Sequence, residues 1–137
     1  MSPCLFCSVV SGETEASVVV RRASAIAFLD HRPLFKGHTL VVPRAHLTTL
    51  EEMPPELIEP FFTLARDLSR AVVTALGAQG SFVAMNNTVS QSVPHLHAHV
   101  VPRTKGDGLR GFFWPRQRYD EGEMGEYAER LRLALAS

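Results

Sequence analysis

Three histidines at two-residue spacing constrain this chain most: His95, His97 and His99 alternate with apolar residues. Alternation of this period predicts a β-strand, in which residues i, i+2 and i+4 lie on one face of the sheet. We therefore expect the three imidazoles on one face and Leu96, Ala98 and Val100 on the other, in a core. On such a strand the outer two histidines are about 13 Å apart, too far for one metal ion to bind all three. The histidines thus require more than one role.

The size and charge of the chain limit its class. A length of 137 residues suits one domain, residues 1–137, with a sizeable core. Because 14 basic residues balance 14 acidic ones, the chain lacks the general attraction to phosphate backbones that nucleic-acid polymers require of their partners. The N-terminus lacks the features of a secretory signal, and no apolar run is long enough to span a membrane. We expect a soluble cytoplasmic protein.

Two cysteines, Cys4 and Cys7, form a Cys-x-x-Cys pair near the N-terminus. In a reducing compartment this spacing indicates a metal pair or a redox motif. Two thiolates and two imidazoles make a closed tetrahedral zinc site, which is structural because no coordination position is left for water. The best suppliers of imidazole are His46 and one end of the histidine strand, with His95 favoured.

The remaining pattern predicts an α+β fold: a mainly antiparallel sheet of about five strands plus a hairpin, packed by one long helix and a C-terminal helix. Strands are expected at 17–21 and 25–29, which form the hairpin, and at 38–43, 81–87 and 95–101. A short helical turn is expected before Gly12, the long helix over 57–76, and the last helix over 124–135. Pro60 is expected to restart or kink the long helix in its first turn.

The segment from Gln91 to Val101 resembles the signature of the histidine triad (HIT) superfamily of nucleotide hydrolases and transferases. The likeness covers most of the chain. Cys4–Cys7 resembles the N-terminal motif of the zinc-containing members, Ala27–Asp30 resembles a strand end whose acidic residue holds ribose, and Gly37–His46 resembles the segment that follows.

This resemblance implies a role for each matching residue. His97 is the nucleophile and His99 a second catalytic residue that contacts phosphate. Structural zinc is held by Cys4, Cys7, His46 and His95. Among the substrate contacts, Phe6 forms part of the wall of the base pocket and Asp30 accepts hydrogen bonds from the ribose hydroxyls. His38 has a supporting role. Contacts to the phosphates or the leaving group are made by Asn86, Gln91, Ser92 and His99. HIT proteins of this type are generally homodimers, which makes Trp114, in the aromatic patch Phe112–Trp114, a candidate for reaching the neighbouring subunit's site.

The chain departs from the HIT pattern in one loop, because Asn86–Gln91 is shorter than usual and lacks the glycines common before Gln91. After the triad, Val101–Asp107 resembles the dinucleoside-polyphosphate hydrolase branch more than the phosphoramidase branch.

The function expected is cleavage at the α-phosphate of a small nucleotide derivative, either a nucleoside phosphoramidate or a dinucleoside polyphosphate, through a nucleotidyl-histidine intermediate on His97. Three alternatives stay open. One is a nucleotide-binding adaptor with vestigial hydrolysis. Another is a metallohydrolase whose catalytic metal is bound by His95 and His97. The third is a purely structural zinc module.

Overall fold

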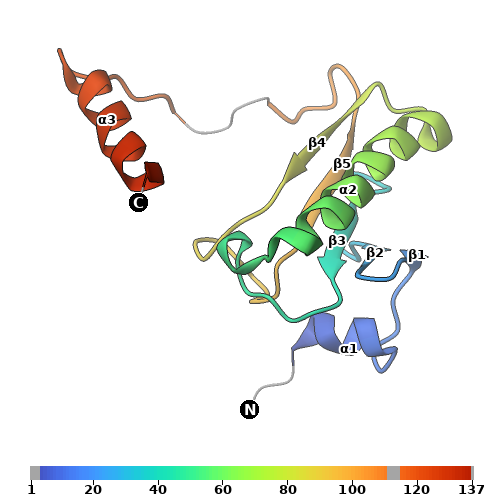
Figure 1. Cartoon of the computed structure of the whole chain (residues 1–137). Helices are drawn as coiled ribbons and strands as arrows, with labels where there is room; N and C mark the ends of the chain where they lie inside the picture. The colour runs from blue at the N-terminus through green and yellow to red at the C-terminus, as the bar shows by residue number, and fades with distance from the viewer. Residues whose placement is uncertain (1–3, 111–114, 137) are drawn as a thin grey trace. The chain divides into compact units, whose positions relative to one another are not determined.

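A computed structural model describes residues 4–110 and 115–136, in two compact units, Met1–Asp107 and Gly108–Ser137 (Figure 1). The first unit contains α1 (Leu5–Ser11), β1 (Val18–Arg21), β2 (Ala25–Leu29), β3 (Thr39–Pro43), the short 3-10 helix η1 (Leu50–Glu52), α2 (Pro55–Leu76), β4 (Gly80–Ala84) and β5 (Ala98–Arg103). The second unit contains α3 (Glu123–Ala136). The α+β class predicted from the sequence is confirmed.

The five strands form one sheet in the order β1-β2-β3-β5-β4, and every neighbouring pair is antiparallel. The hairpin predicted at the start of the chain provides β1 and β2 of this sheet. Within the sheet, β5 lies between β3 and β4, with His99 opposite Leu40 of β3 on one side and Ala84 of β4 on the other. The strand that carries His99 is therefore an interior strand, fixed by pairing on both sides.

The sheet buries a different set of side chains on each face, as the two-residue period of a strand requires. Ala25, Ala27 and Val41 belong to a core shared with Phe61, Leu64 and Leu68 of α2, and Leu96, Ala98 and Val100 complete it. Ile26, Phe28, Leu40 and Val42 form a second core with Phe6 and Val9 of α1. The apolar residues that alternate with the histidines thus lie in a core, as predicted. The structure shows that this core is the one under α2, and that α1 covers the other face (Figure 1).

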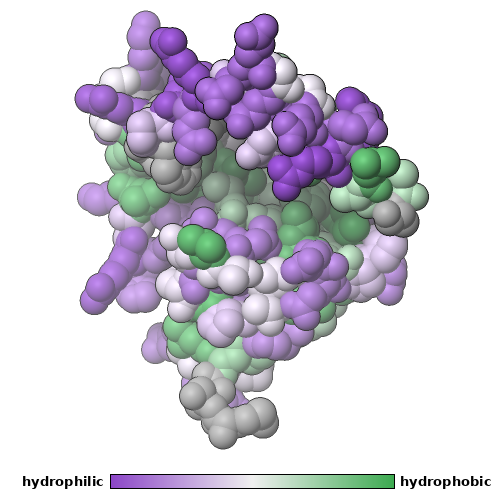
Figure 2. All heavy atoms as spheres, turned by 90° about the vertical axis from the view of Figure 1, so that its left-hand side faces the viewer, coloured by the Kyte–Doolittle hydropathy of each residue, from purple (hydrophilic) through white to green (hydrophobic). Residues whose placement is uncertain are grey.

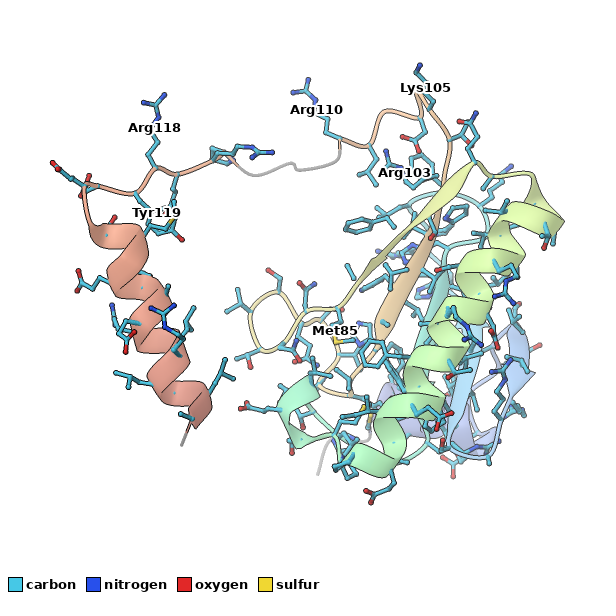
Figure 3. The ribbon with its side chains drawn as sticks, turned by 45° about the horizontal axis from the view of Figure 1, so that its top comes forward. Met85, Arg103, Lys105, Arg110, Arg118 and Tyr119 are labelled. Atoms are coloured by element: carbon cyan, nitrogen blue, oxygen red, sulfur yellow. The ribbon has the colours of Figure 1, made fainter. Side chains whose placement is uncertain are left out.

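The long helix α2 begins with Pro55 in its first turn and ends at Gly77, which adopts the left-handed conformation with φ 73°. The helix continues through Pro60 as one element of 22 residues, so the predicted restart does not occur. Pro60 removes a single N–H bond close to the N-terminus, and the buried face that includes Phe61 and Leu64 holds the helix against the sheet. Met85, which directly follows β4, packs against the same core (Figure 3).

The histidine segment is less regular than its alternation predicts, because β5 begins only at Ala98. The paired residues of β3 and β5 end at Val41 and Ala98. Further along β3, Pro43 has no N–H, and its carbonyl accepts from the ring of His95 at 2.8 Å instead of from a strand. Leu96 donates its N–H to Leu47 O at 2.7 Å. Contacts with Pro43 and with the loop after β3 therefore replace strand pairing at His95 and Leu96.

The second unit presents α3 with its apolar side chains exposed, among them Met124, Tyr127 and Leu131. The predicted C-terminal helix over 124–135 is confirmed with slightly wider bounds. The aromatic patch Phe112–Trp114 lies outside the described residues. None of the helices described is long and apolar enough to cross a membrane.

Candidate active site

Four predicted metal ligands meet where α1 begins: Cys4, Cys7, His46 and His95 each bring one ligand atom within 4.8 Å of the others. The Nδ1 atom of His95 lies 3.4 Å from Cys4 Sγ and 3.5 Å from Cys7 Sγ, and His46 Nδ1 lies 3.3 Å from Cys7 Sγ. The sequence separates these residues by up to 91 positions, and tertiary packing brings all four together.

The donor set fits zinc. With Zn–S near 2.3 Å and Zn–N near 2.05 Å, sulfur and nitrogen in a tetrahedral site are about 3.6 Å apart, close to the distances found here. His95 donates its Nε2–H to the carbonyl of Pro43, which leaves Nδ1 as a lone pair facing the sulfurs. Burial lowers the pKa of His95, against the opposing effect of the Pro43 hydrogen bond, so its imidazole is neutral and able to coordinate.

The central histidine of the triad has one ring nitrogen committed and one free. His97 Nδ1 lies 2.8 Å from the backbone carbonyl of His95, and because a carbonyl only accepts, Nδ1 carries the proton. Nε2 of this tautomer keeps its lone pair. The ring is only 4% exposed and lies edge-on to Phe6, with centroids 5.0 Å apart. This is the arrangement a nucleophilic imidazole needs: one nitrogen fixed as a donor, the other unprotonated.

A second chain of hydrogen bonds sets the tautomer of His99. Leu34 donates its backbone N–H to His38 Nδ1 at 3.1 Å, so the proton of neutral His38 is on Nε2. His38 Nε2 lies 2.9 Å from His99 Nδ1 and donates to it. The remaining proton of neutral His99 is then on Nε2, where it is free to be donated to another group. His38 thus supports the site through His99.

Both members of this pair are neutral at pH 7. Burial is the main cause that lowers the pKa of His99 to about 4, and the neighbouring imidazoles of His97 and His38 lower it further, against the attraction of Asp30. Burial also lowers the pKa of His38, against the opposing effect of Asp30. His99 therefore acts as a neutral hydrogen-bond donor.

Asp30, His38 and His99 form a second group whose ligand atoms lie within 4.8 Å of one another. The tautomer of His38 argues against a metal ion there. An ion on His38 Nε2 would require a proton on Nδ1, and that proton would face the N–H of Leu34. The short His38–His99 distance is accounted for by a hydrogen bond.

A pocket of about 730 Å³ opens in front of His97 and His99. Apolar walls come from α1, which contributes Leu5, Phe6 and Val9, and from Phe28 and Leu40 of the sheet. Asp30 and Ser92 also line it. The predicted residues Phe6, Asp30, Ser92, His97 and His99 are therefore brought together around one cavity, and His38 lies behind His99.

Two predicted contacts do not line this pocket. Asn86 donates its side-chain amide to Ser90 O at 3.2 Å, within its own loop. Gln91 accepts from Thr88 N at 2.9 Å and donates to Thr48 O at 2.6 Å. Through these hydrogen bonds both amides hold the loop Asn86–Gln91 in place. Their contacts to the phosphates or the leaving group stay predictions. The same loop places Thr88 and Ser90 at φ 73° and 61°, in the left-handed region where glycine is unstrained.

Sequence reasoning missed the groups that set the tautomers: Pro43 O, His95 O and Leu34 N–H. All three are backbone atoms, which carry no side-chain signal. It also missed Glu15, a carboxylate at the pocket whose neighbours in sequence form no motif.

The family model for the HIT domain matches residues 11–106 of this chain. The protein named hit from Bacillus subtilis is 35% identical over 139 residues, with 98% of this chain and 95% of that relative covered. The adenosine 5'-monophosphoramidase HNT1 from Candida albicans is 26% identical, with coverage of 97% and 91%.

Solved structures match over nearly the whole chain. A member of the HIT family from Bacillus subtilis has a TM-score of 0.89 at 31% identity, with 99% of each chain covered. A zinc-bound histidine triad family protein from Mycobacterium smegmatis has a TM-score of 0.74 at 34% identity, with 98% of this chain and 97% of that chain covered.

Proposed function

The chain belongs to the HIT domain family, and from that premise we propose that it is a nucleotide hydrolase or transferase that cleaves at the α-phosphate of a nucleotide derivative. The observation that carries this proposal is the state of His97: Nδ1 is held by the carbonyl of His95, and Nε2 keeps a lone pair in a ring that lines a pocket large enough for a nucleotide. A phosphoramidate or a dinucleoside polyphosphate is the proposed substrate class.

The proposed reaction has two steps. His97 Nε2 attacks the α-phosphorus, a nitrogen–phosphorus bond forms, and the bond to the leaving group breaks as the leaving group takes a proton from solvent. Water, or a second phosphate, then attacks the same phosphorus, the nitrogen–phosphorus bond breaks, and the nucleotide leaves His97; the proton lost by an attacking water passes to solvent. Nδ1 of His97 keeps its hydrogen bond to His95 O throughout, so the ring that becomes cationic is stabilised by a fixed acceptor.

The other pocket residues bind and orient. His99 donates Nε2–H to a non-bridging oxygen of the α-phosphate, and His38 holds it in that tautomer. Asp30 accepts from the ribose hydroxyls, Phe6 packs against the base, and Ser92 contacts the phosphates. Asn86 and Gln91 contribute by holding the loop before the triad in place, and the second amide proton of Gln91 remains available for the leaving group.

Zinc is proposed as a structural ion held by Cys4, Cys7, His46 and His95. When bound, it supplies a cross-link between α1, the loop after β3 and the segment that leads into β5. The apolar wall of the pocket belongs to α1, and the carbonyl of His95 orients His97. These four residues therefore connect the pocket wall with the nucleophile.

A homodimer is proposed from the surface around β4. This strand is at the edge of the sheet, and exposed edges favour pairing with another strand. Val83 of β4 and a stripe on α2 formed by Ile58, Phe62, Val73 and Leu76 are exposed apolar side chains. Separate patches of hydrophobic side chains are visible on the molecular surface (Figure 2). Pairing of β4 with its symmetry mate would join two sheets and cover this surface.

The expectation that Trp114 reaches the neighbouring subunit's site concerns a residue outside the described ranges.

Of the three alternatives, a purely structural zinc module leaves His97, His99 and the pocket in front of them without a function. The other two make predictions of their own. A metallohydrolase needs His95 and His97 on one ion, but His95 Nδ1 faces the cysteines and His97 Nδ1 is bonded to a carbonyl. Turnover that is lost at once on chelation, without loss of fold, would favour it. A nucleotide-binding adaptor would bind nucleotide tightly with negligible turnover.

The test is a panel of adenosine and guanosine phosphoramidates and dinucleoside polyphosphates incubated with the pure protein. The proposal expects release of a nucleoside monophosphate from at least one of them, with a transient protein adduct of one nucleotide. Binding of nucleotide without hydrolysis of any member of the panel would contradict it.

A further inference from the structure

Two carboxylates line the pocket, and their surroundings differ. Asp30 accepts from the backbone N–H of Arg32 at 2.9 Å and lies 3.8 Å from His38 Nε2. Glu15 has no hydrogen bond or ion pair with any residue in 4–110 or 115–136. All of its oxygen lone pairs are available to a ligand.

Glu15 belongs to a segment that is fixed at both ends. Thr14 donates its backbone N–H to Ser8 O and its hydroxyl to Ser8 Oγ, each at 3.1 Å, which ties the segment to α1. Ser17 accepts from Leu29 N at 3.0 Å, which ties it to the end of β2. The backbone of this segment thus holds Glu15, whose side chain is exposed, between the helix that provides the apolar wall and the strand that leads to Asp30.

Glu15 reaches the pocket from a different segment of the chain than the triad residues do. Leu5, Phe6 and Val9 of α1 form an apolar wall suited to a flat base, and the ring of Phe6 lies beside His97. Thr14, Glu15 and Ser17 supply polar groups from the segment between α1 and β1. A base that stacks on the apolar wall presents its polar edge to groups of this kind.

We propose that Glu15 is a specificity-determining residue whose carboxylate accepts hydrogen bonds from the donor edge of a guanine base. This inference rests on the proposed nucleotide site. The Watson–Crick edge of guanine has two adjacent donors, N1–H and the 2-amino group, which match the two oxygens of a carboxylate. Adenine offers the 6-amino donor beside the N1 acceptor, whose lone pair faces and repels a carboxylate oxygen.

The proposal is tested by calorimetry with GMP, AMP and IMP, and by kcat/KM for the phosphoramidates of guanosine and adenosine. The wild-type protein should prefer GMP to AMP by about tenfold, the low end of what a hydrogen bond to a charged group contributes. IMP should bind more weakly than GMP, because it keeps N1–H and lacks the 2-amino group.

Three variants make the test specific. Glu15→Ala should bring the ratio of GMP to AMP affinity close to one. Glu15→Gln should shift the preference toward AMP, because an amide both donates and accepts as the adenine edge requires. Glu13→Gln is the matched control: this exposed glutamate makes the same change of charge two residues away, does not line the pocket, and should keep the wild-type ratio.

The outcomes separate this inference from the proposed function. Equal affinity of the wild-type protein for GMP and AMP, or an unchanged ratio in Glu15→Ala, overturns the role of Glu15 even if the phosphoramidates are hydrolysed. Selective binding of GMP without any turnover supports Glu15 and contradicts the proposed chemistry. Absence of binding by every nucleotide overturns both.

Discussion

The ring of His97 and the backbone carbonyl of His95 are 2.8 Å apart, and this one hydrogen bond links two different roles in the triad. The side chain of His95 faces the two cysteines, and its carbonyl fixes the tautomer of the proposed nucleophile. Any change that moves His95 therefore also changes the orientation of His97.

Replacing His97 by alanine should abolish the covalent intermediate, because it removes the imidazole whose Nδ1 is fixed by His95 O and whose Nε2 keeps a lone pair at the pocket. The expected result is a folded protein with turnover reduced by several orders of magnitude, roughly the loss seen when a catalytic nucleophile is removed. Intact-mass spectrometry of quenched reactions checks it. An adduct of equal abundance in His97→Ala and in the wild-type protein would assign the chemistry to another residue.

Replacing Cys4 by serine should lower the zinc content and the melting temperature, because the three remaining ligands bind the ion less tightly and the cross-link from α1 through Cys7 is populated less. Zinc is measured by elemental analysis and stability by calorimetry. Ser11→Ala, an exposed change on the same helix, serves as the control and should keep its zinc. The metal assignment fails if the cysteine variant retains as much zinc as the control.

His38 should act through the tautomer of His99. His38→Ala removes the donor to His99 Nδ1, so the proton of His99 is free to shift to that nitrogen, and we expect kcat to fall by roughly 10- to 100-fold. His38→Gln offers an amide N–H near the same place and should recover most of the loss. If alanine and glutamine variants are equally impaired, the hydrogen bond is not what His38 contributes.

Stability should fall as the pH drops from about 6.5 toward 4. The pKa of His99 is about 4 in the folded protein, below the ordinary value of 6.5. Between these values the unfolded chain binds a proton that the folded protein excludes, so the free energy of unfolding decreases as the pH is lowered. His99→Gln should show a shallower decrease than the wild-type protein in urea titrations, with zinc content measured in parallel. Identical slopes at equal zinc content would show that His99 does not carry this dependence.

A charge on the edge strand should separate the proposed dimer. Val83→Lys places an ammonium group on exposed β4 and should give a monomer in sedimentation experiments, since burying an unpaired charge is costly. Val19→Lys is the matched control, because Val19 is 50% exposed on β1, the opposite edge, and Val83 is 44% exposed. Dimerisation through β4 is wrong if both variants sediment alike.

Much of the fold was predictable from local pattern. The apolar stripe of α2 and its stop at Gly77 follow from helical periodicity, and the burial of Ala98 and Val100 follows from alternation along a strand. The grouping of the four candidate metal ligands was also predictable, because Cys4 and Cys7 have the spacing of zinc ligands and few histidines were available to complete the set. These predictions depend only on the types of side chain and on their separations along the chain, both of which are given by the sequence.

The tertiary structure alone decided which atoms of those residues are available. The proton on each ring of the triad depends on Pro43 O, His95 O and Leu34 N–H, and the amide of Gln91 is engaged by Thr48 O. Backbone groups are the same in every residue, so no sequence pattern identifies which of them a side chain will meet. The register of β5 likewise depends on pairing with β3 across more than fifty residues, and only the folded sheet shows that it begins after His97.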